Sequence, residues 1–225
     1  MRDKLIYGLS AIAALLLVRN LYAIFMVIPD EVQQGMIFRI IFFHVPAWVV
    51  ALGCALAGLL ASVGFLVTKN FKFDAVAVAV TEVGLAFTCV GLVTGSIWGR
   101  IMWGVWWAWD ARLTSALICW LLYGGYLMLR HAIDEPTQRA TFAAAVNIFA
   151  FVDVPIVIFS IKWWNTQHPR PVFWAGGSFD PVYLPTFLLN MLAMVLVGVV
   201  MVLVRLRQEE TQREIDSLRR YAHAI

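Results

Sequence analysis

The chain has 225 residues, of which 62% are hydrophobic and only 14% are charged, and its formal net charge is +3. A water-soluble protein of this length needs far more charged surface, so the composition excludes a soluble globular domain and indicates a protein surrounded by lipid. The small net charge gives no reason to expect a nucleic-acid partner. All three cysteines lie in apolar runs without a Cys-x-x-Cys pair, which argues against a disulfide framework, structural zinc and thiol redox chemistry.

Six long apolar segments follow one another along the chain, separated by polar turns. Each is close to the roughly 20 residues that a helix needs to cross the hydrocarbon core of a bilayer. The predicted spans are residues 5–28, 47–68, 75–97, 113–129, 140–161 and 183–204. The expected fold class is therefore an all-α membrane protein, in which a six-helix bundle forms one domain over residues 1–204.

The two ends of the chain differ in character. The first span starts after Met-Arg-Asp-Lys, as a signal peptide would, but Arg19-Asn20 interrupts its apolar run and no small-residue cleavage site follows. We therefore expect a retained anchor. Residues 205–225 are rich in charge and contain helical pairs such as Glu209–Arg213, which predicts a short solvated helical tail.

The distribution of Lys and Arg predicts the orientation of the spans. The richer set of helix ends includes both termini, which the positive-inside rule places in the cytoplasm. Three loops would then face outward: 29–46, 98–112 and 162–182. Because the inner connections are short, we expect any chemistry in the membrane or on its outer face. The basic inner ends and the lack of a transit peptide favour a multi-pass protein of a bacterial inner membrane.

Four tryptophans crowd the second outer loop, in the stretch MWGVWWAWDAR at 102–112. An aromatic belt at the lipid headgroups would place Trp on both sides, but the predicted inner side has almost none. If the stretch were helical, one face would carry Trp103, Trp106, Trp107 and Asp110, with Trp109 on its flank. Such an indole surface would bind a large planar apolar ligand by area and dispersion, with Asp110 and Arg112 fixing its rim or the loop.

Two histidines flank this stretch at the same outer level. His44 lies in RIIFFHVPAW just before the second span, and His168 lies in WWNTQHPRPVFW just after the fifth. Two imidazoles presented from different helices favour axial ligation of haem iron, with the macrocycle between them. Arginines on the same side would pair with the haem propionates, namely Arg39, Arg100, Arg112 and Arg170. Local hydrogen bonds for each histidine remain an alternative, and a zinc site would need a further carboxylate ligand.

The segment WGVWWAWDARLTS resembles the tryptophan-rich WWD motif of membrane haem-handling proteins. With RIIFFHVPAW before it, WWNTQHPRP after it and six predicted spans, the chain is similar to the cytochrome c maturation protein C (CcmC) family over about residues 29–200. The resemblance implies an outer-face haem site with His44 and His168 as the axial ligands. It also implies that Trp103 to Asp110 hold the edge of haem b, a cargo bound without covalent bonds.

The same resemblance implies partners. Haem would pass to a membrane-tethered chaperone, CcmE, on the outer side. An ABC-type ATPase and permease pair, CcmA and CcmB, and a single-span helper, CcmD, would work beside this chain. The chain has no nucleotide-binding motif, so ATP use would belong to another subunit. The expected role is a haem-binding and transfer component rather than an enzyme.

Two other functions remain open. A lyase would attach haem to an apocytochrome, but related lyases tend to be longer and to carry histidines inside their spans, where this chain has none predicted. A haem-translocating ABC subunit would need a continuous path, and the spans offer few charges, namely Arg19, Glu82 and Asp153. The roles of these three charges are left open, while the Gly91–Gly95 pattern in the third span predicts close helix packing.

Overall fold

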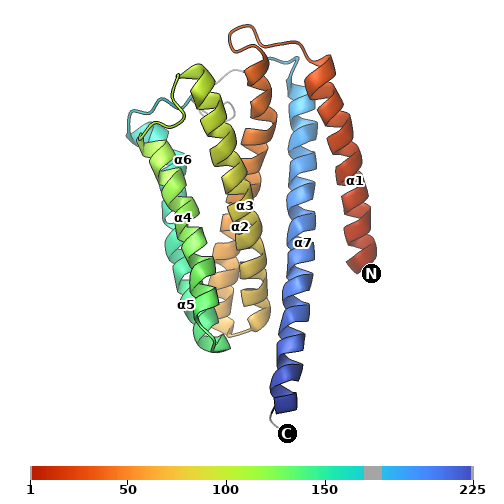
Figure 1. The fold of residues 1–225 in the computed structure, drawn as a ribbon, viewed down its shortest axis with the longest axis vertical. Helices are drawn as coiled ribbons and strands as arrows, with labels where there is room; N and C mark the ends of the chain where they lie inside the picture. Colours follow the sequence, from red (N-terminus) through yellow and green to blue (C-terminus); the bar gives the residue numbers. More distant parts are fainter. Residues whose placement is uncertain (1, 170–178, 224–225) are drawn as a thin grey trace.

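The computed structural model describes residues 2–169 and 179–223, and helices dominate it. The helices are α1 (Arg2–Tyr22), α2 (Ile41–Thr68), α3 (Phe71–Met102), α4 (Ala111–Ala132), α5 (Pro136–Phe151), α6 (Asp153–Trp163) and α7 (Leu184–His223). A short π-helix (Ala23–Val27) extends α1, and a 3-10 turn (Met36–Ile40) leads into α2. Helices α2 to α6 form a bundle, α7 packs beside α2 and α3, and α1 packs on α7 (Figure 1).

Within the described residues, six helical segments are long and apolar enough to cross a membrane, which confirms the predicted number. Their bounds are Arg2–Val27, Met36–Thr68, Phe71–Met102, Ala111–Ala132, Pro136–Trp163 and Leu184–Arg219. The second span begins well before residue 47, so His44 lies in the first turn of α2 and inside the span, and not in the loop expected before it.

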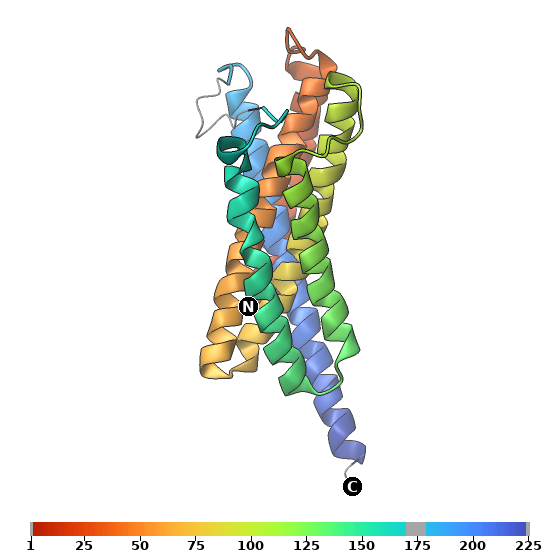
Figure 2. The same ribbon diagram turned by 90° about the vertical axis from the view of Figure 1, so that its left-hand side faces the viewer.

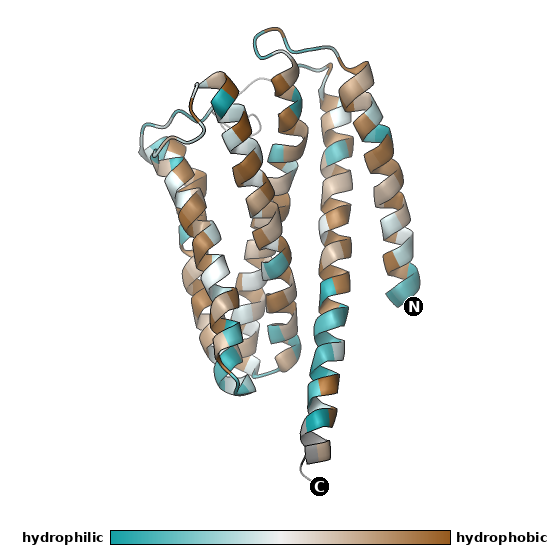
Figure 3. Cartoon of the chain, in the orientation of Figure 1, coloured by the Kyte–Doolittle hydropathy of each residue, from teal (hydrophilic) through white to brown (hydrophobic). Residues whose placement is uncertain are grey.

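The connections between the helices lie at the two ends of the bundle. Those that follow the first span and α3 lie at one end, together with residues 164–169 after α6 (Figures 1 and 2). The α2–α3 and α4–α5 turns and the C-terminal end of α7 lie at the opposite end. Hydrophobic residues cover the middle of the helices, whereas hydrophilic residues gather on the C-terminal part of α7 (Figure 3). The described parts of the outer loops predicted from the sequence thus lie at one end of the bundle.

Small residues allow the helices to pack closely. A Cβ added to Gly84 of α3 would lie only 2.9 Å from the Cys54 side chain of α2. A Cβ added to Gly198 of α7 would lie 2.6 Å from the Val50 side chain of α2. In lipid, apolar burial gives little drive for helix association, so close contact between backbones supplies much of the packing energy. These glycines therefore set how near α3 and α7 approach α2.

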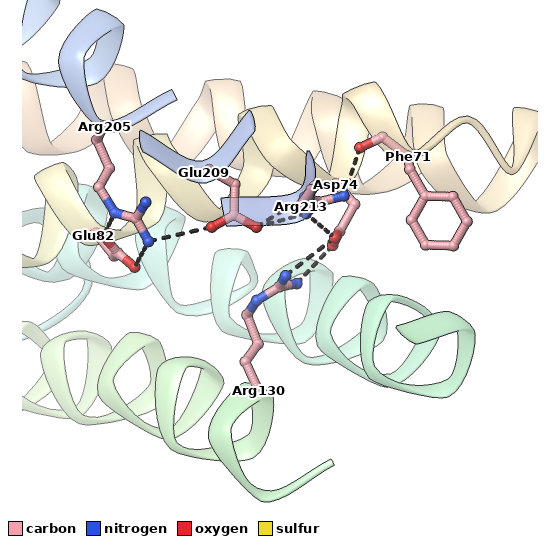
Figure 4. Close-up of polar contacts among 7 residues, drawn as sticks. All are labelled: Phe71, Asp74, Glu82, Arg130, Arg205, Glu209 and Arg213. Carbon is pink, nitrogen blue, oxygen red and sulfur yellow. Dashed lines mark hydrogen bonds and ion pairs between the residues drawn. The ribbon is translucent and has the colours of Figure 1, made fainter. Parts of the chain in front are cut away.

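An ion-pair network joins α7 to α3 and α4 (Figure 4). Arg130 of α4 donates to both oxygens of Asp74 of α3, at 2.6 and 3.1 Å, and both side chains are buried. Arg213 of α7 also contacts Asp74, at 2.6 Å, and pairs with Glu209. The segment predicted to be a solvated helical tail is indeed helical, but the face that carries Arg213 is bound to α3 by this ion pair and is not fully solvated.

The charged residues whose roles were open have different surroundings. Glu82 pairs with Arg205 of α7 and so belongs to the same network (Figure 4). Arg19 donates to the neighbouring Asn20 at 2.9 Å. Asp153 has no ion pair among the described residues. Two of these three charges therefore have a local structural partner.

Candidate functional site

His44 and His168 face each other. Their ring centroids are 6.4 Å apart, and the ring planes are inclined by 31°. Each axial imidazole places its ring centre about 3 Å from the iron, because the metal–nitrogen bond is about 2 Å long and the nitrogen lies roughly 1 Å from the ring centre. The two ring centres are then about 6 Å apart. The pair therefore has the spacing of axial ligands. In the described part of the chain, no cluster of three His, Cys, Asp or Glu side chains could hold a metal ion, so the zinc alternative gains no support.

The backbone around His44 depends on α7. Pro46 has no N–H, so the carbonyl of Phe42 lacks its usual helical donor. Asn190 of α7 is fully buried and donates its side-chain Nδ2 to that carbonyl at 2.6 Å. Satisfying this carbonyl lets α2 continue as a helix through Pro46, because an unpaired backbone group is costly in lipid. The loop expected at His44 is consequently replaced by a helical turn.

The pattern at Gly91–Gly95 predicted close helix packing, within the chain or onto a partner, and the structure shows that this packing is within the chain, against α2. A Cβ at Gly91 would lie 2.7 Å from the indole of Trp48, and one at Gly95 would lie 3.1 Å from Cε1 of His44. Both aromatic side chains come from α2. The absence of side chains on this face of α3 thus makes room for the His44 ring.

The position of His168 depends on Asp110. The Asp110 carboxylate caps α4 by accepting from the N–H of Leu113 at 2.8 Å. It also accepts from the N–H of Gln167, at 3.1 Å, and from the hydroxyl of Thr166. That hydroxyl oxygen in turn accepts from the N–H of His168 at 3.1 Å. One carboxylate therefore ties the tryptophan-rich segment to the segment that carries the second histidine.

The His168 ring is set up to act as a neutral ligand. Its Nδ1 donates to the carbonyl of Pro169 at 2.8 Å, which leaves Nε2 available. Burial and the nearby positive charge of Arg112 lower the pKa of His168 from 6.5 to about 3. At pH 7 the ring is therefore uncharged, which is the form of imidazole that coordinates a metal.

The tryptophan-rich segment is irregular, so the shared helical face considered from the sequence does not form. Helix α3 ends at Met102, and Gly104 takes a positive φ of 76° that a right-handed helix does not allow. Arg100 donates to the Gly104 carbonyl, and Asp110 starts α4. The turn at Gly104 therefore prevents α3 from continuing through 103–110.

Within this segment the indoles divide into two groups. Trp103 packs edge-on against Trp98, with ring centroids 5.0 Å apart, and covers Gly99. Trp106 and Trp109 are 61% and 77% exposed, and the partly buried Trp107 packs edge-on against Trp109. Trp106 and Trp109, rather than Trp103, thus offer exposed aromatic surface within this segment.

The arginines expected to bind propionates are in different situations. Arg39 donates to the carbonyls of Ile24 and Ile28 and pairs with Asp30, so its donors hold the connection between the first two spans. Arg112 donates to the Val157 carbonyl of α6 at 3.1 Å. Its positive charge contributes to the lowered pKa of His168.

Among these candidates, Arg112 is therefore the described arginine whose charge acts on His168. Arg100 holds the turn at Gly104. Arg170 lies outside the described residues. Sequence reasoning missed Thr94, which contacts the His44 ring, Thr166, which accepts from the N–H of His168, and Asn190, which donates to the Phe42 carbonyl two residues before His44. A signal existed for Thr94 alone, because it adjoins a glycine of the GxxxG pattern.

Comparison with known proteins identifies the family. The family model described as "Heme exporter protein C" matches residues 1–221. The chain belongs to the heme exporter protein C family. It is 40% identical over 213 residues to the family member of Bradyrhizobium diazoefficiens, an alignment that covers 93% of this chain and 80% of that protein. With the Escherichia coli K12 member it shares 35% identity over 179 residues, 80% of this chain and 73% of that one.

Relatives extend beyond bacteria. A ccmC-like mitochondrial protein of cytochrome c biosynthesis from Marchantia polymorpha is 36% identical over 185 residues, 81% of this chain and 78% of that protein. Membership in the heme exporter protein C family makes this chain a haem-handling, multi-span membrane component of the Ccm system for cytochrome c biogenesis. The resemblance stated from the WWD segment is thereby confirmed.

Proposed function

We propose that the protein binds haem b non-covalently between His44 and His168 and delivers it to the chaperone CcmE during c-type cytochrome maturation. The facing imidazoles carry this proposal, because their 6.4 Å separation fits one iron between them. Each ring has its Nδ1 in a hydrogen bond, to Thr94 or to the Pro169 carbonyl, so Nε2 is the nitrogen of each ring that would bind the metal.

The surroundings support a planar apolar cargo. The exposed Trp106 and Trp109 precede Asp110, which is bonded to the His168 segment, so their rings are available to the edge of a macrocycle. Arg112 supplies positive charge beside the site for a propionate. The excess of Lys and Arg at the opposite end favours a site on the periplasmic face of a bacterial inner membrane, with both termini in the cytoplasm.

Transfer requires that one axial bond can be exchanged. His44 is held on a helix, whereas His168 lies on a non-helical segment after α6. The chaperone would therefore displace His168 more readily than His44. No bond of the haem itself is broken, so the role is carrier rather than enzyme, beside the CcmA–CcmB transporter pair and the helper CcmD.

The proposal is tested by the visible spectrum of the full chain, purified in detergent and titrated with haem. A six-coordinate low-spin bis-imidazole spectrum is expected, followed by transfer of the haem to purified CcmE. A five-coordinate spectrum, or haem lost on gel filtration, would contradict the proposed site. Covalent haem on a Cys-x-x-Cys-His substrate, formed by this chain alone, would instead support the lyase function.

Asp110 provides a sharper test of how the site is held. Replacing Asp110 with alanine removes a helix cap and both bonds to the His168 segment. Haem affinity is expected to fall about 10–100-fold, as when an outer-shell partner of a metal ligand is lost. Glu135→Ala is the matched control, because Glu135 caps α5 by accepting from the N–H groups of Thr137 and Gln138 at the other end of the bundle. Equal affinities in the two variants would refute the positioning role.

A further inference from the structure

The His44 ring rests against one turn of α3. Its Nδ1 lies 3.0 Å from the hydroxyl oxygen of Thr94, and its Cε1 would be 3.1 Å from a Cβ at Gly95. Thr94 and Gly95 are consecutive, and the two contacts are made by neighbouring atoms of the same edge of the ring. We call these two residues the His44 socket.

The hydrogen-bond pattern determines which way the Thr94 contact runs. The hydroxyl of Thr94 has a single hydrogen, and its oxygen lies 2.6 Å from the carbonyl oxygen of Val90 and 3.1 Å from that of Gly91. Carbonyl oxygens only accept, so the hydrogen is committed to them. Towards His44 the hydroxyl oxygen must therefore accept, and Nδ1 of His44 must carry the hydrogen.

We propose that the socket selects the tautomer of His44, with Thr94 acting as a positioning residue for the haem ligand. In a neutral imidazole only one nitrogen is protonated, so a hydrogen on Nδ1 leaves a lone pair on Nε2. Gly95 keeps the ring close enough to Thr94 for that bond to form. This inference rests on the proposed haem binding and adds a residue of α3 that does not touch haem.

The two axial histidines are then prepared in different ways. His168 donates to a carbonyl of its own segment, whereas His44 donates to a side chain of another helix. A neutral hydroxyl raises the basicity of a ligand less than a carboxylate partner does. His44 is therefore oriented firmly without a strongly strengthened iron bond, which suits a site that must later release its cargo.

The test compares Thr94→Val, which keeps the shape of the side chain, with Thr94→Ser, which keeps the hydroxyl. In haem-free protein labelled with ¹⁵N-histidine, the His44 signals, assigned by their loss in His44→Ala, should show the Nδ1–H tautomer in the unaltered chain and in Thr94→Ser. Thr94→Val should lose that preference and bind haem about 10–100-fold more weakly. Its haem reduction potential should rise, because an imidazole that donates no hydrogen bond is a poorer electron donor to iron.

Thr88→Val is the matched control. Thr88 is buried on the same helix and donates to the Gly84 carbonyl at 2.8 Å, so this variant loses an equivalent intrahelical bond away from the imidazole. It should leave the tautomer and the haem affinity unchanged. Gly95→Ala should displace the ring and weaken haem binding, whereas Gly53→Ala of α2, where a Cβ meets nothing within 4 Å, should not.

The outcomes separate this inference from the proposed function. An Nε2–H tautomer in the unaltered chain would overturn the inference whether or not haem binds. Bis-imidazole binding that Thr94→Val leaves unchanged would also overturn it, while the proposed function would stand. Failure of the unaltered chain to bind haem would refute the proposed function, and the labelled haem-free protein would still decide whether Thr94 sets the tautomer.

Discussion

Replacing either His44 or His168 with alanine is expected to abolish the six-coordinate haem spectrum and to weaken haem retention at least about 100-fold. The loss should exceed the 10–100-fold effect of an outer-shell partner, because an axial bond itself disappears. The single variants should give five-coordinate haem held by the remaining imidazole, and the double variant should retain none above background. Visible absorption after gel filtration in detergent measures both effects.

His131→Ala is the control for these variants. His131 is exposed near the end of α4, at the end of the bundle opposite the site, and its removal should leave the spectrum unchanged. Adding imidazole to the single variants should restore a six-coordinate spectrum if the missing ligand was the only defect. Unchanged low-spin haem in both alanine variants would show that other residues ligate the iron.

Replacing Asp74 with alanine is expected to lower the free energy of unfolding by on the order of 3–5 kcal/mol, the cost of leaving a buried charge without its partner. Arg130 is only 8% exposed and would lose two hydrogen bonds, and Arg213 would lose its contact with α3. Unfolding in a mixed detergent series, followed by circular dichroism, measures the change. Haem binding by the folded fraction should remain, because the network lies at the other end of the bundle.

Two further variants check the mechanism of this destabilisation. Asp74→Ala combined with Arg130→Met removes both buried charges and should recover a large part of the lost stability. Asp134→Ala removes an exposed carboxylate of the neighbouring α4–α5 turn and should change stability by no more than about 0.5 kcal/mol. If the double variant were less stable than Asp74→Ala alone, the unpaired Arg130 could not be the cause.

Hydropathy and rare residues carried most of the prediction from sequence. The number of spans followed from apolar length, because lipid allows only self-satisfied helices or closed barrels to cross it. The WWD segment was recognisable because four tryptophans in seven positions are improbable in any ordinary helix end. His44 and His168 stood out by their place at the ends of predicted spans, and the structure brings them together.

Other features could not be obtained from local patterns. The predicted spans placed His44 in an outer loop at 29–46, but Asn190, distant in sequence, satisfies the carbonyl that Pro46 leaves free and so the helix continues. The helical face proposed for Trp103 to Asp110 fails because Gly104 turns the chain. In the same way, the sequence predicted a solvated C-terminal segment, but Arg205 and Arg213 of this segment pair with Glu82 and Asp74 of α3.

The sequence by itself determined the membrane class, the number of spans, the family and the identity of the two facing histidines. Only the tertiary structure decided which side chains orient them: Thr94 for one ring, and Asp110 through Thr166 for the other. The physical reason is the distance along the chain between the residues that interact. Apolar length and residue rarity are properties of contiguous sequence, whereas a hydrogen bond between helices depends on which faces meet in space.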